Sequence, residues 1–402
     1  MAIPSTTKYW TGGNSGNTGD WEEPMNWEGD SLVNASYAWT ASAGGEDEYY
    51  LRTSAPADPS VSDPSSGAGT ISEGDAEMTN GTIASLAAGE WDYGDGDSLG
   101  YSTIYVRLTS GSADPDDRIV HYVKSHYIPV ASDTVIVPAR SDNAIDANLD
   151  QSALSLAAFD VEEGFTKNIG TDTASLELNT GGNFSYHGTG ALAKFDFGVN
   201  LTNVVIFNTG APSVGESACQ LHGTGMSTIT VFNGDVAIGF DRNSTDETNS
   251  VEIYQIDVTK QPTCVRLGVN VTDLDGSGDP DIIMEDGKCF AKCDVDVCQI
   301  LGGEYWQVLG KWAAGTFKDC MVHIQDALTG RTFAASTVHP GGAVRNETSY
   351  VAHTFTNVTV HAGGEWTDKN LGTYTNPIST PDGIGNNGAN LSFGPATTIA
   401  PA

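Results

Sequence analysis

The sequence predicts an all-β protein whose body is a parallel β-solenoid, and three observations carry this prediction. The stretch from Leu176 to Val258 consists of apolar runs of about three to five residues, rich in β-branched and aromatic side chains, several of them alternating at period two. Gly, Asn and Asp cut these runs, and similar turn phrases return at intervals of roughly 20 to 40 residues. No amphipathic helix intervenes, which favours one solenoid coil per repeat. Because the repeat is degenerate, a β-sandwich remains the alternative.

The repeats also bear on individual residues. The expected strands in this stretch are 175–178, 184–186, 194–197, 204–207, 228–232, 236–238 and 252–254. Between them, His187-Gly-Thr-Gly returns as His222-Gly-Thr-Gly, and Phe207-Asn-Thr-Gly returns loosely as Phe232-Asn-Gly-Asp. Two histidines can bind a metal or transfer protons, but equivalent positions in stacked coils explain the pair equally well.

Charge limits the classes of partner. The 402 residues, enough for a large core and two or three domains, contain 18 Lys and Arg against 52 Asp and Glu, a formal charge of −34. Such a surface repels nucleic acid, whose affinity for proteins comes from Lys and Arg on phosphates, and it disfavours anionic membranes. Solubility alone is the other explanation for the charge.

The sequence shows neither a membrane span nor a signal peptide. No run approaches about 18 consecutive apolar residues. The first eight residues lack a charged segment followed by an apolar one, so we expect synthesis in the cytosol or export by another route. Without an export signal, the six cysteines are expected to be free and buried: Cys219, Cys264, Cys289, Cys293, Cys298 and Cys320. The spacing of the central three differs from the CxxC of zinc sites.

Three tryptophans mark the N-terminal segment, which contains Trp10-Thr-Gly-Gly, Trp21 and Asn26-Trp27. A later segment, 128–138, combines proline with the alternating run Asp-Thr-Val-Ile-Val. Together they resemble the opening coil of bacterial adhesin and phage β-helices, in which aromatic side chains cap the open end of the solenoid. The resemblance implies a split cap, with its first half in residues 1–30 and a β-rich domain inserted at residues 31–126.

The insertion contains the second resemblance. A Pro-, Ser- and acid-rich stretch at 56–74 predicts an exposed loop. Beyond it, the sequence predicts a hairpin around the turn 94–100, formed by Trp91, Tyr93, Ile104, Tyr105 and Val106. The phrase that runs from Leu86 to Asp116, L-A-x-G-E-W-x-Y, then T-I-Y-V-R-L, then D-P-D, resembles a segment of virion structural proteins of tailed phages. It implies a component of a phage particle.

The remaining chain divides into a body and a tail. Residues 127–366 are the predicted solenoid body, in which the alternating run 353–360 places Phe355, Val358 and Val360 in the core. Residues 367–402 are rich in Gly, Asn, Pro and Thr, and we expect an extended C-terminal arm that becomes ordered by wrapping a neighbour.

One acidic loop matches a metal site. The segment 273–281 reads Asp-Leu-Asp-Gly-Ser-Gly-Asp-Pro-Asp. Its predicted oxygen ligands for Ca²⁺ are Asp273, Asp275, Ser277 and Asp281, with Gly278 at the sixth place. The sequence departs from the calcium-loop pattern at position 12, where the pattern has a bidentate Glu and this chain has Met284. The nearest glutamate, Glu285, lies one residue further along. The alternative is an acidic, Gly-rich turn between coils, so Ca²⁺ is not a required cofactor.

Other candidate sites have structural explanations beside the functional ones. A turn rich in Gly and acidic residues contains Asp92, Asp95 and Asp97. Such a turn is more often the solvated tip of a hairpin than a metal site. The rings of Tyr305, Trp306 and Trp312 can line a sugar groove, but covering the solenoid side or a subunit interface is the favoured reading.

Motifs for enzymatic chemistry are missing from the sequence. There is no nucleophile elbow, P-loop or GxGxxG, and with 52 acidic residues a pair of carboxylates at glycosidase spacing is expected by chance.

These observations favour a non-enzymatic structural protein of a tailed-phage virion, assembled in the host cytoplasm. We expect it on the exterior of the particle as a decoration, cement or fibre-like component, bound to other capsid or tail proteins, as a homotrimer. A tailspike that cleaves host polysaccharide is the enzymatic alternative, and a receptor-binding adhesin is the third reading.

Overall fold

The computed structural model is built from β-strands, with one short 3-10 helix, η1 (Pro24–Asn26). It describes residues 7–12, 18–28, 38–52, 63–64, 69–74, 76–111, 113–116, 123–141, 143–198, 202–212, 217–239, 246–269, 271–272, 281–325, 330–347, 353–361, 363–368, 373–375, 378–380, 390–392 and 398–400. These residues contain no α-helix, so the prediction of an all-β protein is confirmed. The chain divides into two compact units, unit 1 (residues 1–149 and 156–160) and unit 2 (residues 150–155 and 161–402).

Unit 1 contains two small sheets and the beginning of a longer one. The five-stranded sheet has the order β3 (Ala38–Ala41), β4 (Tyr49–Arg52), β9 (Thr103–Arg107), β8 (Glu90–Gly94) and β7 (Thr79–Asn80). The three-stranded sheet has the order β10 (Val123–Tyr127), β5 (Gly69–Glu73) and β6 (Ala76–Glu77). The other strands are β1 (Thr7–Trp10), β2 (Trp27–Glu28), β11 (Thr134–Val137) and β13 (Ala158–Val161). The antiparallel pairing of β8 with β9 confirms the predicted hairpin.

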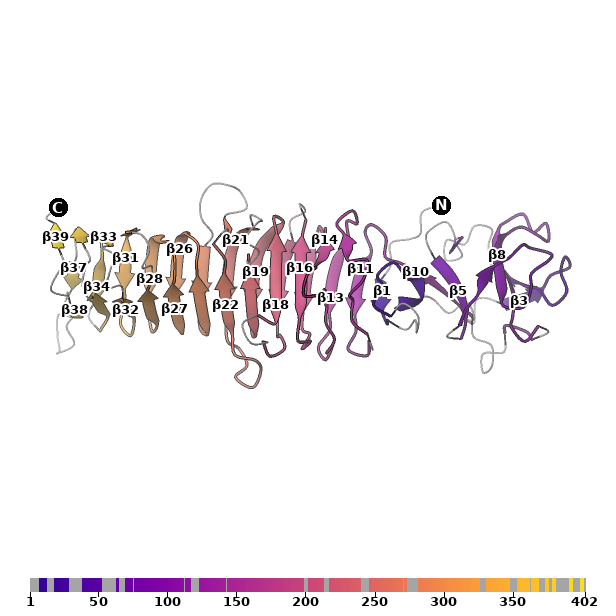
Figure 1. Ribbon diagram of the computed structural model, residues 1–402, viewed down its shortest axis with the longest axis horizontal. Coiled ribbons are helices and arrows are strands. Elements are labelled where there is room, and N and C mark those ends of the chain that lie inside the picture. Colours follow the sequence, from indigo (N-terminus) through magenta and orange to yellow (C-terminus); the bar gives the residue numbers. More distant parts are fainter. Residues whose placement is uncertain are drawn as a thin grey trace. The chain divides into compact units, whose positions relative to one another are not determined.

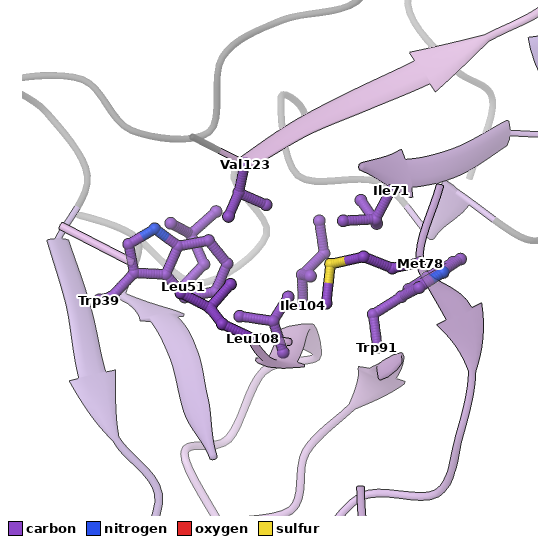
Figure 2. Packing of buried hydrophobic residues seen from close by; sticks show 9 residues of the cluster. Trp39, Leu51, Ile71, Met78, Trp91, Ile104, Leu108 and Val123 are labelled. Carbon is purple, nitrogen blue, oxygen red and sulfur yellow. The ribbon is translucent and has the colours of Figure 1, made fainter. Parts of the chain in front are cut away.

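One buried apolar cluster holds the two small sheets together (Figure 2). Trp39, Leu51 and Ile104 come from the five-stranded sheet, whereas Ile71 and Val123 come from the three-stranded one. All five are buried. Burying a side chain of this size stabilises a fold by about 1.5–3 kcal/mol, so the cluster accounts for the association of the sheets.

The three N-terminal tryptophans form a second cluster in unit 1. Trp10 of β1 and Trp27 of β2 lie opposite each other in an antiparallel pair, with ring centroids 5.1 Å apart and edge to face. Trp21 lies 4.7 Å from Trp27 and stacks on Phe159 of β13 at 6.2 Å. All four side chains are fully buried. β1 also pairs in parallel with β11, which brings the two sequence segments that resemble a split cap side by side.

Unit 2 consists of three parallel sheets. Long sheet 1 has the order β15 (Asn183–Tyr186), β17 (Thr202–Ile206), β19 (Met226–Val231), β21 (Asp246–Ile253), β24 (Asp281–Met284), β26 (Val295–Ile300), β28 (Trp312–Phe317), β31 (Ser336–Val338), β34 (Thr359–His361) and β37 (Ile378–Thr380), with β23 (Val271–Thr272) beside β21. Long sheet 2 has the order β12 (Asp150–Gln151), β14 (Leu176–Leu178), β16 (Ala193–Phe197), β18 (Cys219–Gly223), β20 (Asp235–Ile238), β22 (Cys264–Leu267), β25 (Lys288–Ala291), β27 (Glu304–Gln307), β29 (Met321–Ile324), β32 (Ala343–Asn346), β35 (Glu365–Asp368) and β38 (Asn390–Ser392). The C-terminal sheet has the order β30 (Thr332–Ala334), β33 (Thr354–Thr356), β36 (Thr373–Thr375) and β39 (Thr398–Ala400).

The strands of unit 2 follow one another in sequence order, alternating between the sheets (Figure 1). On long sheet 1, partners on neighbouring strands are as few as 16 residues apart, as for Ile282 and Cys298, and as many as 31 apart, as for Val251 and Ile282. From β30 onward, the C-terminal sheet adds a third strand to each repeat. Strands β36 to β39 lie in the stretch predicted to be an arm, and they pair in parallel with the preceding strands.

Alternation along many of the strands directs one row of side chains inward. In β22, β24, β25 and β27 every second residue is buried. Because the strands are parallel and in register, buried residues stack in continuous rows at about the 4.8 Å spacing of neighbouring strands. One row on long sheet 2 contains Val236, Val265, Cys289, Tyr305, Val322, Val344 and Trp366, each completely buried.

The predicted strands between residues 175 and 254 each overlap an observed strand, whereas the run 353–360 differs. The chain forms two strands there, β33 and β34, which belong to different sheets. Asn357 separates them with a φ of 54°, a left-handed conformation that breaks extended structure. Phe355, Val358 and Val360 are nevertheless all buried, as predicted.

Candidate functional site

The predicted calcium loop falls largely outside the described residues. Asp273, Asp275 and Ser277 are not described, and Asp281 is the first residue of β24. One carboxylate oxygen of Asp281 accepts the backbone N–H of Val297 at 3.1 Å. Within the described ranges, no group of three or more His, Cys, Asp or Glu side chains is arranged to hold a metal ion. Calcium binding by this loop stays a prediction.

The three acids of the unit 1 hairpin are hydrogen-bond acceptors, Asp95 within the hairpin turn and the other two for neighbouring segments. Asp92 accepts a backbone N–H at 3.1 Å, and Asp95 accepts two at 2.5 and 2.9 Å. Asp97 accepts a serine hydroxyl at 2.9 Å and a backbone N–H at 2.8 Å. The contacts of Asp95 close the turn between β8 and β9, whereas those of Asp92 and Asp97 bind the hairpin to the segments at Ile83 and Ala43. This agrees with the structural reading of the three residues.

The two repeated histidines do not occupy equivalent positions, so that prediction is wrong. His187 follows the end of β15 on long sheet 1, whereas His222 lies within β18 on long sheet 2. The intervals between strands vary, so the same four-residue phrase falls once after a strand and once inside one. The other repeated phrase is structurally equivalent: Phe207 and Phe232 each follow a strand of long sheet 1 and stack with centroids 5.3 Å apart. His187 continues this stack on Phe207 at 4.0 Å.

The aromatic residues near Gly310 separate into core and surface. Tyr305 and Trp312 are completely buried, so the prediction that they cover an outer face is wrong for both. The alternation of β27 places Tyr305 and Gln307 inside and Trp306, which is half-buried, outside. The Tyr305 hydroxyl donates to Oε1 of Gln307 at 2.6 Å, which satisfies two polar groups in the interior.

The cysteines match the sequence expectation in most respects. All six are free, and five are buried; Cys264 is half-buried. Burial raises the pKa of the Cys289 thiol well above its ordinary value and also raises that of Cys219. Buried neutral thiols of this kind are unreactive packing groups.

The most developed polar assembly is the outer-face network of long sheet 2, which comprises Lys288, Glu304, His323 and Glu347. Nζ of Lys288 lies 2.8 Å from one oxygen of Glu304, and the other oxygen lies 3.5 Å from Nε2 of His323. Nδ1 of His323 lies 2.9 Å from a carboxylate oxygen of Glu347. Because an ionised carboxylate only accepts, Nδ1 carries the proton. Four charged or titratable groups thus link β25, β27, β29 and the residue after β32.

Aromatic stacking accompanies this network on the same face. The rings of Phe290 and Trp306 stack with centroids 5.9 Å apart, and the Trp306 and His323 rings stack at 3.8 Å. A sugar binds aromatic residues through an open ring face. Here Trp306 has one face on each neighbour, so the stack joins three strands and offers mainly ring edges outward.

The charges of the network suit a structural role better than proton transfer. The Lys288 ammonium is the main cause that holds the pKa of Glu304 below its ordinary value, with His323 adding to the effect. A carboxylate with a lowered pKa stays ionised at neutral pH and is a poor general acid. The network therefore fixes the strands to one another by paired charges.

A row of carboxyl groups on long sheet 2 escaped the sequence reasoning. Asp150, Glu177 and Asp196 are register partners on β12, β14 and β16. Partial burial and the two flanking carboxylates raise the pKa of Glu177, whereas hydrogen bonds from Ser152 lower the pKa of Asp150. Only the register brings these acids together, and no spacing in the sequence reveals it.

A scan against protein-family models, a search of curated proteins and a search of solved structures each find no match to this chain. In the part of the chain that the structure describes, no helix has the length and apolar character needed to cross a membrane.

Proposed function

We propose that unit 2 is a right-handed parallel β-solenoid and that the chain is a non-enzymatic structural protein of a tailed-phage virion. The observation that supports the solenoid is the continuous, in-register parallel pairing from β15 to β37 on one sheet and from β12 to β38 on the other. In such a body each coil binds its neighbours through backbone hydrogen bonds and inward rows of side chains. The contribution of the molecule is then stiffness.

The location on a virion rests on the sequence resemblances at residues 10–27, 128–138 and 86–116. The fold supports it in one respect: Lys288, Glu304, Trp306, His323 and Glu347, on the outward face of long sheet 2, are engaged with one another in ion pairs, a hydrogen bond and a ring stack. A surface of that kind suits a rigid exterior component better than a reactive cleft. We place the protein on the outside of the head or tail as a decoration, cement or fibre-like homotrimer that binds other virion proteins.

Spin labels test the solenoid. Ser185, Gln299 and Thr337 lie on one outward row of long sheet 1, with Gln299 five strands and Thr337 seven strands from Ser185. At about 4.8 Å per strand, the backbone separation is expected to be about 24 Å for a Ser185→Cys, Gln299→Cys pair and about 34 Å for a Ser185→Cys, Thr337→Cys pair. Pulsed electron spin resonance measures both. Equal distances for the two pairs would contradict a linear stack.

Gold-labelled antibody against the chain tests its place on the particle. Electron micrographs of purified virions from the encoding phage are expected to show gold on the exterior at symmetric positions. Labelling of free protein with none on intact particles would reject the virion proposal and leave the solenoid untouched.

The carboxyl row favours one alternative, a tailspike polysaccharide depolymerase. Asp150 and Glu177 lie on neighbouring strands and their pKa values are displaced in opposite directions, which is the relation an acid and a nucleophile require. Release of reducing ends from host polysaccharide by the wild type, abolished by Glu177→Gln and retained by the exposed-acid control Glu162→Gln, would establish this activity in place of the structural role.

A further inference from the structure

Unit 1 contains a pocket of about 460 Å³ that the proposed structural role does not use. Pockets for small-molecule ligands span about 300–1,000 Å³, so this one has room for a small organic ligand. The described residues that line it combine apolar and uncharged polar side chains with one carboxylate: Pro24, Gly69, Thr70, Glu77, Met78, Thr79, Asn80 and Trp91.

The pocket lies where the chain passes from one small sheet to the other. β6 is the last strand of the three-stranded sheet, β7 is the last strand of the five-stranded one, and Met78 is the residue between them. Met78 and Trp91 belong to the buried cluster that joins the two sheets, and only 2% and 3% of their surfaces are exposed (Figure 2). These two side chains form an apolar floor, and the exposed residues Glu77, Thr79 and Asn80 form a polar rim.

A carboxylate is held at the rim by a neighbouring hydroxyl group. Oγ1 of Thr70 on β5 donates to Oε1 of Glu77 on β6 at 2.9 Å. This contact uses one lone pair, whereas an ionised carboxylate offers about four, so Glu77 can accept further hydrogen bonds from a ligand. Glu77 is also the only ionisable side chain among the described residues of the lining. The pocket therefore favours ligands that donate hydrogen bonds and disfavours anions.

Asn80 supplies donors that complement this acceptor. The residues on either side of it, Thr79 and Gly81, donate their backbone N–H groups to carbonyl oxygens within residues 89–91 at 3.0 and 2.8 Å. Because successive backbone groups of a strand point to opposite edges, the N–H and carbonyl groups of Asn80 face the edge at which the described sheet ends. The side-chain amide adds two donors and one acceptor.

We propose that this pocket binds a neutral sugar unit, whose hydroxyl groups donate to Glu77 and exchange hydrogen bonds with Asn80 while its apolar C–H groups pack over the floor. A sugar carries many hydroxyl groups and no charge, which matches a rim of one carboxylate, one amide and two hydroxyl groups. An acidic sugar is disfavoured by Glu77 and by the formal charge of −34. A peptide that adds a strand is also disfavoured, because β6 and β7 have 2 residues each and stable strands usually have about three or more. This inference does not rest on the proposed virion role.

Ligand-observed NMR on the full chain tests the site. The probes are the methyl glycosides of glucose, galactose, mannose and N-acetylglucosamine, and sodium glucuronate is the anionic control. We expect saturation transfer from the protein to at least one neutral probe, with an amplitude that reaches a plateau on titration, and none to glucuronate. Absence of saturable binding by all four neutral probes, or preferential binding of glucuronate, would overturn the proposal.

Glu77→Gln is expected to weaken binding of the preferred probe about tenfold or more, because a neutral acceptor replaces a charged one. Glu46→Gln is the matched control, since Glu46 is an exposed glutamate of unit 1 that does not line the pocket. Asn80→Ala provides a second test if Glu77→Gln does not fold, and circular dichroism checks the fold of each variant. Wild-type affinity in a folded Glu77→Gln or Asn80→Ala variant would contradict the assignment of the sugar to this pocket.

Discussion

Replacement of Trp312 by alanine is expected to lower the free energy of unfolding by about 3–5 kcal/mol, the range observed for deeply buried aromatic residues. Trp312 is completely buried, and its ring lies 4.5 Å from Phe333 and 5.2 Å from Phe317 by centroid distance. Its Nε1 donates to Oγ of Ser336 at 3.0 Å. The substitution therefore leaves a large cavity beside three strands and removes an interior hydrogen bond. Urea titration followed by circular dichroism measures the loss.

Trp306→Ala is the matched control for this prediction. Trp306 lies on β27, the strand that precedes β28, but on the outward side, where it is half-buried. Its removal costs two ring stacks and little core volume, so we expect a loss of about 1–2 kcal/mol. A larger loss for Trp306→Ala than for Trp312→Ala would show that inward and outward faces have been assigned the wrong way round.

Alkaline conditions are expected to destabilise the protein steeply. Burial raises the pKa of Cys219, Cys289 and Cys298 far above the value of 9.0 for an ordinary thiol, and it raises the pKa of Cys320 to about 12. The native thiols therefore stay protonated while the unfolded chain releases their protons above pH 9. The protonated native thiols contribute their full share to the free energy of unfolding below pH 9. As the pH rises from 9 toward the native pKa values, this contribution falls by about 1.4 kcal/mol per pH unit for each thiol.

Urea titrations at pH 8 and pH 10.5 measure this effect. For the three fully buried thiols the loss adds up to about 6 kcal/mol. Cys219→Ala separates thiol ionisation from other alkaline effects, because it lowers the pH slope by about 1.4 kcal/mol per pH unit whatever its effect at pH 8. An unchanged stability between the two pH values would refute the assignment of these thiols to the interior.

The sequence predicted the strands of unit 2 well because their signal is local. Short runs of β-branched and aromatic residues with period-two alternation describe a half-buried strand, whichever strand pairs with it. The same alternation marks Phe355, Val358 and Val360 as core residues without revealing that β33 and β34 belong to different sheets. The split depends on the conformation of Asn357, a residue type that also occurs within strands.

The arrangement of side chains between strands could not be predicted, because it depends on register. Successive strands of long sheet 1 are separated by 16 to 31 residues, so no fixed period tells which residues become neighbours. Glu304 and His323 lie on adjacent strands, as do Asp150 and Glu177, yet neither pair has a recognisable spacing. The inward position of Trp312 could not be predicted for a similar reason. The strand that contains it is rich in Gly and Ala, so its own sequence does not show which of its two faces is buried by the neighbouring strands.

The order of pairing also sets how the polypeptide acquires its structure during translation. Each strand of unit 2 docks on one made a few tens of residues earlier, so assembly proceeds from the amino toward the carboxyl end as the chain leaves the ribosome. Strand β1 of unit 1 differs from these strands, because its parallel partner β11 is synthesised more than a hundred residues later. Closing that long loop costs chain entropy, so we expect the pairing of β1 with β11 to be a late step of folding.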